Sequence, residues 1–402
     1  MILWSITLIG YSQNIVNKDE IYSYWHTTKY YQVRAAENIY MLKRPKTTIM
    51  KKNLIIILLT MISQLIIHAQ AVYVDCINGD DSNSGIKTAP VYSIGKAIEI
   101  IKSRDNDIYI MKINPGIYIL DNHISVISEK DMTDKRIIIE ASVLPGDSIW
   151  TPEKMPVITS KAMKGEIPIN SNFVVSFLIG ESHVTIRGIK FQGYFYPHVR
   201  YFPIARFDKT KTDLLVEQCI FNGDANISQI QAGIIANGNE IKIEHCIFYK
   251  IRNTVVFFLD SGEGIKTGNG ITNSVIYGTS QAVWTVSPDK DFKFENNIVS
   301  NCRYVWAKND FNTTKYAIDN SIIVNNKYYT GIANKERLSP IDFEIKENNV
   351  IKKGEISLIL TGNNDEPYLD EVDKPLPINY MHPNPDLIEN DIEAGLFINR
   401  EQ

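Results

Sequence analysis

The sequence lacks the short motifs that mark several large enzyme classes. It has no glycine-rich phosphate loop, no cysteine and histidine spacing typical of a zinc site, and no nucleophile elbow. It also lacks an excess of basic residues, because 42 Lys and Arg stand against 46 Asp and Glu. A nucleic-acid partner requires a basic surface, so the composition predicts none.

The sequence has no apolar run as long as the roughly 20 residues that a membrane-spanning helix needs. The best candidate, residues 54–67, follows the basic start Met50-Lys51-Lys52 and precedes Ala69-Gln70-Ala71. This order is typical of a secretory signal peptide. We therefore predict that residues 50–71 are a cleaved signal peptide, with an uncleaved membrane anchor as the alternative. The mature protein is expected to be a monomer that is secreted, in the periplasm, at the cell surface or outside the cell.

Residues 1–49 precede the predicted signal peptide and carry no repeat. We interpret them as a spurious upstream extension, with translation starting at Met50, or as a disordered segment. Without residues 1–71 the chain has 34 basic and 43 acidic residues, a net charge of −9. This charge also disfavours a nucleic-acid partner for the mature chain.

A short phrase recurs between residues 183 and 350, in forms such as VTIRGIKF, LLVEQCIF and IKIEHCIF. Apolar residues alternate with polar ones within each copy, which is typical of a β-strand. The second apolar residue of each copy, here called the anchor, is Ile186, Val216, Ile243, Ile271, Phe294, Ile318 or Ile345. Successive anchors are 23 to 30 residues apart. Repeats of this length indicate a solenoid in which neighbouring copies stack and share one core.

The third position after the anchor bears on the bends and on the cysteines. Asn297 and Asn348 occupy it and are predicted to form tight bends, since asparagine tolerates left-handed backbone geometry. Cys219 and Cys246 occupy it in successive copies, so they are expected to lie at the strand spacing of about 4.8 Å. A secreted protein could join them in a disulfide, but parallel side-chain directions fit two buried thiols better.

The stretch before the repeats has a characteristic order of elements. Val72–Val74 is expected to be a strand, Ser93 to cap a helix over residues 94–102, and Pro115-Gly116 to turn the chain between two more strands. Together with the repeats after residue 183, this order resembles the secreted right-handed parallel β-helix proteins of the pectate-lyase-like superfamily. The resemblance spans about residues 71–355.

The resemblance implies an all-β fold, a single-stranded right-handed parallel β-helix over residues 72–355 with a short N-terminal capping helix. Residues 356–402 contain five prolines and break the repeat, so we expect an irregular C-terminal segment packed on the last coils. The superfamily contains lyases, hydrolases and non-enzymatic proteins. It therefore implies a polysaccharide ligand without fixing an activity.

In such a fold, the strand before each repeated phrase forms the face where enzymes of the superfamily place their sites. Trp284 and Trp306 lie on two successive strands of this kind. If both point outward they form a platform for sugar rings, and if inward they belong to the core. The stretch 194–206 is a second predicted ligand-binding region, with Tyr194, His198 and Arg200 as candidates; the alternative is an apolar loop packed over the coil.

Ionisable residues near the same strands suggest lyase chemistry. Cleavage of a uronic-acid glycan by β-elimination needs a base and a cation that neutralises the carboxylate. Arg206 and Lys308 are candidates for these roles, and Asp260 is a third catalytic candidate. Ca²⁺ on carboxylates could assist, although no metal ligand is assigned. The coil order is similar to that of the alginate lyase and chondroitinase B family, whose arginine would align near Lys308 but whose calcium carboxylates have no clear counterpart here.

The sequence is consistent with two functions. The first is a polysaccharide lyase, and the second is a non-catalytic glycan-binding or cell-surface structural β-helix protein. Trp284 and Trp306 pointing outward beside Lys308 and an acidic pair would favour catalysis, whereas a bare apolar face would favour binding or structure. Hydrolysis is disfavoured, because the Gly-His-Gly and Arg-x-Lys patterns of polygalacturonase-like enzymes are absent between residues 180 and 350.

Overall fold

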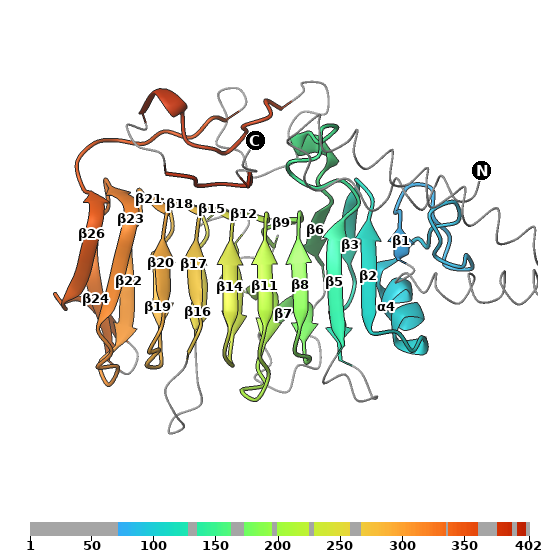
Figure 1. The fold of residues 1–402 in the computed structure, drawn as a ribbon, viewed down its shortest axis with the longest axis horizontal. Coiled ribbons are helices and arrows are strands. Elements are labelled where there is room, and N and C mark those ends of the chain that lie inside the picture. Colours follow the sequence, from blue (N-terminus) through green and yellow to red (C-terminus); the bar gives the residue numbers. More distant parts are fainter. Residues whose placement is uncertain are drawn as a thin grey trace, which may run out of the picture. The chain divides into compact units, whose positions relative to one another are not determined.

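The computed structural model describes residues 71–127, 135–161, 173–194, 199–224, 229–257, 267–334, 337–360, 376–387 and 392–398. Residues 1–49 and nearly all of the predicted signal peptide lie outside these ranges. The described chain forms one parallel sheet of 17 strands and a second sheet of nine strands, which wind into a β-helix (Figure 1). No helix in the described ranges is long and apolar enough to cross a membrane.

Each coil contributes strands to three faces. Face 1 is part of the 17-stranded sheet and contains β1 (Val72–Val74), β2 (Ile108–Ile113), β5 (Arg136–Ala141), β8 (Val184–Arg187), β11 (Leu214–Glu217), β14 (Ile241–Glu244), β17 (Gly270–Thr272), β20 (Lys293–Glu295), β23 (Tyr316–Val324) and β26 (Ile345–Ile351). Face 2 is the rest of that sheet and contains β3 (Ile117–Leu120), β6 (Val157–Ser160), β9 (Lys190–Gln192), β12 (Ile220–Asn222), β15 (Ile247–Tyr249), β18 (Val275–Tyr277), β21 (Ile298–Ser300) and the end of β23. Face 3 is the nine-stranded sheet of β4 (Ile124–Val126), β7 (Phe173–Ile179), β10 (Arg200–Arg206), β13 (Ile234–Ala236), β16 (Val255–Phe257), β19 (Gln281–Thr285), β22 (Tyr304–Asn309), β24 (Tyr328–Asn334) and β25 (Arg337–Pro340).

The strand register confirms the first six anchors of the repeat. Ile186 pairs with Val216, Val216 with Ile243, Ile243 with Ile271, and Ile271 with Phe294. The neighbouring pair Glu295–Asp319 places Phe294 opposite Ile318. All six side chains are buried, because each coil covers the apolar face of the one before it.

The prediction for the seventh anchor is wrong by two residues. Ile345 pairs with Tyr316, and Glu347 takes the position opposite Ile318. The last strand therefore carries a charged side chain in the row that is apolar in every earlier coil, and Glu347 forms an ion pair of 2.5 Å with Lys352. A charge in the core row of an edge strand disfavours the addition of another strand, so this coil ends the stack.

The bends between face 1 and face 2 depend on single residues with left-handed backbone. Gln218, His245 and Asn296 have φ values of 52°, 51° and 55°. The prediction placed this bend at Asn297, which instead follows it and points inward. There the Asn297 side chain donates to the Ile271 carbonyl at 2.8 Å and accepts from the Ser274 amide at 3.0 Å. Likewise Asn349, with φ 52°, has the left-handed backbone that was predicted for Asn348.

The core contains columns of like residues, as stacking of repeats requires. The rings of Phe191, Phe221 and Phe248 stack with centroid separations of 5.0 and 4.7 Å. Cys219 and Cys246 are buried and free, which confirms two stacked thiols in place of a disulfide. Burial raises the pKa of the Cys246 thiol well above its ordinary value, so the thiolate is disfavoured.

The N-terminal end of the core is covered by α4 (Ile94–Ser103), as predicted. The Ser93 side chain caps this helix by accepting from the Lys96 amide at 3.1 Å. The buried side of the helix consists of Ile94, Ala97, Ile98 and Ile101. These residues join the main core and remove an open apolar end from water.

The described C-terminal segment, residues 376–387 and 392–398, lies along the outer side of face 2 and not over the last coils alone (Figure 1). It contains the single-turn helix η2 (Pro385–Leu387). Tyr380, Met381 and Leu396 form an apolar cluster with residues from Trp150 to Val275. The Gln218 side chain donates to the Leu396 carbonyl at 2.9 Å, and the Gly395 amide donates to the Asn273 carbonyl at 2.9 Å. The segment therefore straps several coils together.

His382 makes this strap sensitive to acid. Its ring stacks on Phe397 with centroids 4.8 Å apart, and its Nε2 atom accepts the Leu396 amide proton at 3.0 Å. The second ring nitrogen contacts the Tyr380 carbonyl at 3.1 Å. Nε2 can accept a hydrogen bond only when the ring is neutral. Accordingly, burial lowers the pKa of His382 to about 4.

The free energy of unfolding is expected to fall as the pH drops from about 6.5 to about 4. In that range the unfolded chain binds a proton at His382 that the folded chain does not, which removes on the order of 3 kcal/mol. His382→Gln is expected to remove this part of the pH dependence, and a part due to His245, whose pKa burial also lowers, remains. His123→Gln, a partly exposed histidine outside the strap, is the control. Urea unfolding at a series of pH values tests this, and equal slopes for the parent and His382→Gln would contradict it.

Candidate functional site

Face 3 consists of the strands that the sequence pointed to as the site-bearing face. Within it, Val283 pairs with Trp306, and Trp284 pairs with Ala307. Since paired residues share one side of a sheet, the two tryptophans point to opposite sides. The predicted platform of Trp284 with Trp306 is therefore not formed.

Trp306 is a core residue. It has no exposed surface and packs against Phe292, Phe294 and Tyr316 at centroid separations of 5.3, 5.5 and 4.9 Å. Its indole N–H donates to the Thr285 hydroxyl at 3.1 Å. A buried indole needs such a partner, so the packing and the hydrogen bond together fix this ring inside the coil.

Trp284 lies on the outer side of face 3 and is partly exposed. Its indole N–H donates to the Asn309 side chain at 3.1 Å, which holds the ring in one orientation. The register places it in a row of outward apolar residues that runs across six coils: Leu178, Ala205, Ile235, Val256, Trp284 and Ala307. This outer row contains no charged side chain.

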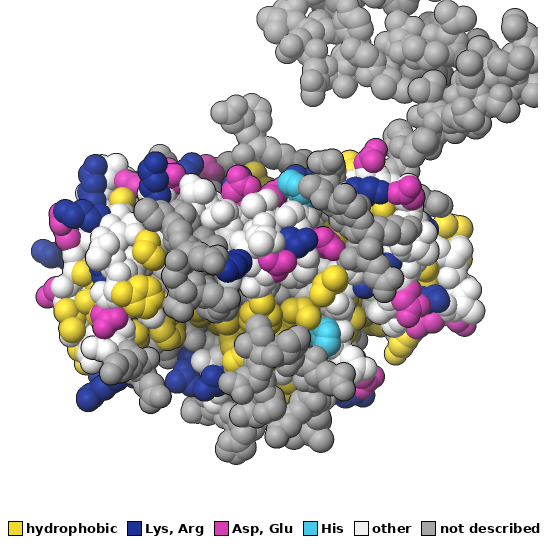
Figure 2. Space-filling model, turned by 90° about the horizontal axis from the view of Figure 1, so that it is seen from below, with side chains coloured by type: hydrophobic (Ala, Val, Ile, Leu, Met, Phe, Trp, Pro, Cys, Tyr) yellow, Lys and Arg dark blue, Asp and Glu magenta, His cyan; other side chains and the backbone are white. Residues whose placement is uncertain are grey.

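The outer side of face 1 is different. One register row there contains Lys112, Glu140, Arg187, Glu217 and Glu244. Glu140 is buried between Lys112 and Arg187, with ion pairs of 2.5 Å to each. Seen from below, hydrophobic side chains form a band across the molecule, and charged side chains lie on both sides of that band (Figure 2). By their register rows, the outer side of face 1 is charged and that of face 3 is apolar.

Two stacked tyrosines lie toward the bend between face 2 and face 3, with Tyr304 buried and Tyr328 partly exposed. The rings of Tyr304 and Tyr328 lie 5.1 Å apart on adjacent coils. A Cβ atom at Gly331 would lie 2.7 Å from the Tyr304 ring, so the ring packs directly over the glycine backbone. Because Gly331 pairs with Ala307, these tyrosines lie beside the row that contains Trp284.

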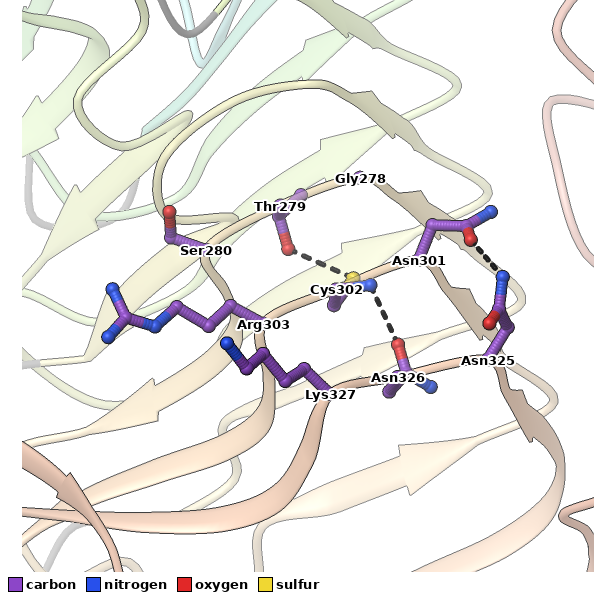
Figure 3. A pocket seen from close by; sticks show the side chains of 9 residues that line it. All are labelled: Gly278, Thr279, Ser280, Asn301, Cys302, Arg303, Asn325, Asn326 and Lys327. Atoms are coloured by element: carbon purple, nitrogen blue, oxygen red, sulfur yellow. Dashed lines mark hydrogen bonds between the residues drawn. The ribbon is translucent and has the colours of Figure 1, made fainter.

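A hollow of about 530 Å³ opens at this bend (Figure 3). It is lined by equivalent residues of three successive coils, 278–280, 301–303 and 325–327. Asn301 and Asn325 join their side chains across two coils. Arg303 and Lys327 are exposed and extend side by side along it (Figure 3).

These cations were not predicted from the sequence, although a periodic signal was present. Each stands nine residues after the anchor of its own coil, counted from Ile243, Ile271, Phe294 and Ile318. In order, that position holds Arg252, Ser280, Arg303 and Lys327. Counted from all six aligned anchors, three have a basic residue at this position, since Phe195 and Ala225 follow Ile186 and Val216 there.

Arg206, a predicted catalytic residue, is buried without exposed surface. Its guanidinium donates to the carbonyls of Asn237 at 2.8 Å, Thr212 at 3.1 Å and Asn239 at 3.2 Å. Burial lowers its pKa to about 10, so it stays protonated at neutral pH. The structure assigns it to holding the chain between face 3 and face 1, and not to a ligand.

Lys308 is the only predicted catalytic residue that is both described and accessible. Its Nζ atom lies 4.5 Å from the centroid of the Phe343 ring, and burial lowers its pKa. Asp260, the third catalytic candidate, lies outside the described residues. The described part of the structure therefore brings no predicted acid and base together.

The predicted substrate-binding loop is only partly described. Tyr194 is buried and packs against Tyr201 with centroids 5.8 Å apart, so it belongs to the core. Arg200 is exposed, and its guanidinium lies 5.8 Å from the centroid of the Phe173 ring. His198 lies outside the described residues.

The sequence assigned no ligands to the Ca²⁺ that could assist a lyase, so this cofactor stays a prediction. Calcium prefers six to eight oxygen ligands with several carboxylates among them. Across the described ranges, which do not include Asp260, no three His, Cys, Asp or Glu residues come close enough to hold a metal ion.

Neither a protein family nor a curated protein matches this sequence. Among solved structures, a rhamnogalacturonan lyase is similar at 15% identity and a TM-score of 0.45, over 66% of this chain and 71% of that one. Pectate lyase Pel9A is similar at 12% identity and a TM-score of 0.41, over 70% and 76%. A GH136 lacto-N-biosidase from Eubacterium ramulus is similar at 10% identity and a TM-score of 0.34, over 67% and 59%.

Identities this low and TM-scores below 0.5 carry no argument about activity. The fold rests on the strand register of this chain itself. By that register the chain is a parallel β-helix.

Proposed function

We propose that this protein is a non-catalytic glycan-binding β-helix protein that holds a polysaccharide on the outer side of face 3. The observation that carries the proposal is Trp284, partly exposed in an otherwise aliphatic outer row. Sugar rings present apolar C–H faces, which stack well on a wide aromatic ring. Apolar surface outside the core tends to mark a binding site.

The surroundings of Trp284 support binding more than catalysis. Asn309 fixes the ring, and Tyr328 offers a second partly exposed aromatic side chain nearby. No carboxylate belongs to the described register row of Trp284. Bond cleavage needs a positioned acid or base within hydrogen-bond reach of the reacting atoms, and the described residues of this row provide neither.

A polysaccharide lyase is the second candidate, and Lys308 is the observation that favours it. Burial lowers the pKa of Lys308, which increases the fraction of neutral amine at a given pH. A neutral amine can remove the proton next to a uronic carboxylate. Lys308 directly follows Ala307 of the outer row, so it lies close to the proposed binding surface.

Trp284→Ala is expected to weaken binding to the preferred polysaccharide roughly tenfold, since an aromatic contact contributes about 0.5–1.5 kcal/mol beyond its buried area. Affinity for a panel of neutral and acidic polysaccharides, measured by calorimetry or affinity electrophoresis, tests this. Tyr92→Ala is the matched control, because Tyr92 is an exposed aromatic residue just before α4.

The proposal fails if no polysaccharide binds, or if Trp284→Ala and Tyr92→Ala bind equally to the parent protein. The same protein preparations also test the second candidate function, a polysaccharide lyase. Absorbance of unsaturated products from uronic polysaccharides, with and without Ca²⁺, reports β-elimination. Product formed by the parent protein and lost in Lys308→Ala would establish the lyase in place of simple binding.

A further inference from the structure

The hollow at the bend between face 2 and face 3 has a rigid floor. Across its coils the Arg303 amide donates to the Thr279 carbonyl, and the Lys327 amide to the Cys302 carbonyl, both at 2.9 Å. The Asn326 side chain accepts from the Cys302 amide at 2.8 Å. Arg303 and Lys327 therefore start from backbone positions one coil apart, about 4.8 Å, and point the same way (Figure 3).

The hollow exists because one coil has small side chains there. Gly278, Thr279 and Ser280 occupy the positions that Asn301, Cys302 and Arg303 occupy in the next coil. The Thr279 hydroxyl turns inward and contacts the Cys302 sulfur at 3.2 Å. The outer surface is thus left open beside Arg303, with amide and hydroxyl groups as its lining.

The two cations have no acidic partner within the described ranges. Arg303 lies 5.5 Å from the Tyr304 centroid and Lys327 lies 5.4 Å from the Tyr328 centroid. On face 1, by contrast, Lys112 and Arg187 are both paired with Glu140. Like charges on adjacent strands are unfavourable. Two exposed cations side by side, on a chain with more acidic than basic residues, can bind an anion from outside the protein.

A third cation extends the row along the coil axis. Arg252 is exposed, and its carbonyl accepts from the Ser280 amide at 3.0 Å. It therefore occupies the position one coil before Ser280 and two coils before Arg303. A row of cations along the coil axis suits a ligand with repeated charges, because simultaneous contacts strengthen one another.

We propose that Arg252, Arg303 and Lys327 form an anion-binding row for sulfate or carboxylate groups spaced along an extended polysaccharide. The row adjoins Tyr304 and Tyr328, which connect it to the outer row of Trp284. This inference rests on the proposed glycan-binding function and adds that the ligand is anionic. The shared chemistry is a negatively charged group on each of several sugars.

The test compares Arg303→Gln/Lys327→Gln with Lys242→Gln/Lys293→Gln, which removes two exposed lysines from face 1. The probes are dextran, dextran sulfate and polygalacturonate. The first double variant is expected to bind a charged probe roughly tenfold more weakly and with a smaller salt dependence. The face 1 variant is expected to match the parent protein. Dextran sulfate and polygalacturonate distinguish sulfate from carboxylate.

Arg303→Lys/Lys327→Arg keeps both charges and is expected to restore binding, which guards against a folding defect. Equal losses in the two charge-removing variants, or no loss in either, would overturn the anionic row. So would equal binding of dextran and dextran sulfate by the parent protein. In each of these cases a loss of binding in Trp284→Ala would leave the glycan-binding proposal standing, whereas absence of binding to every probe overturns both.

Discussion

Trp306→Ala is expected to lower the free energy of unfolding by about 3–5 kcal/mol, the usual cost of removing a large buried aromatic side chain. The indole has no exposed surface and contacts three aromatic rings. Its removal leaves a cavity in a core that cannot close around it, because the coils above and below are held by backbone hydrogen bonds. The Thr285 hydroxyl also loses its donor.

Trp284→Ala is the matched control for this change. Trp284 is partly exposed on the other side of the same sheet, so its loss is expected to destabilise the fold far less. Urea unfolding of both variants gives the comparison. At low urea, where both are folded, Trp306→Ala is expected to keep the parent affinity for glycan. A stable Trp306→Ala protein that no longer binds glycan would contradict this and support the hypothesis that Trp306 is part of a binding platform.

The facing of these tryptophans could not be derived from the sequence because strict alternation fails in face 3. Val305 and Trp306 are consecutive, yet both belong to the main core. Ala282 and Val283 behave in the same way one coil earlier. A strand that turns two successive side chains inward reverses the alternation after it. The two tryptophans are 22 residues apart, whereas the register joins residues 23 apart.

The fold was predictable from the same sequence because its evidence is repeated in every coil. Six anchors share one register, so a wrong assignment at one of them does not change the predicted fold. The prediction failed at the seventh anchor because the last coil has no successor to cover its core row. Glu347 is therefore tolerated opposite Ile318, and the nearest apolar residue, Ile345, lies two positions away. Trp284 has no such redundancy, since the other described residues of its register row are aliphatic.

The buried arginine gives the second of the two large expected effects. Arg206→Ala is expected to lower the free energy of unfolding by roughly 2–4 kcal/mol, because three carbonyl groups lose their donor at once and each unsatisfied buried group costs about 1–3 kcal/mol. Part of that cost is offset, since a charged group no longer has to be buried. Gly238 lies against the same guanidinium, but its φ of 103° and a Cβ position 2.1 Å from the Lys211 carbonyl oxygen mean that no larger residue there could fill the space.

Arg200→Ala separates this structural role from the catalytic role predicted for Arg206. Arg200 begins the same strand, β10, but is exposed, and its removal is expected to change stability by no more than about 0.5 kcal/mol. Urea unfolding measures both variants, and glycan binding or lyase activity is then compared per folded molecule. If Arg206 only stabilises the fold, the binding or activity per folded molecule equals that of the parent protein under conditions where the variant is folded. A variant as stable as the parent but without binding or activity would return Arg206 to the site, and the guanidinium would then have to leave its three carbonyls to reach a ligand.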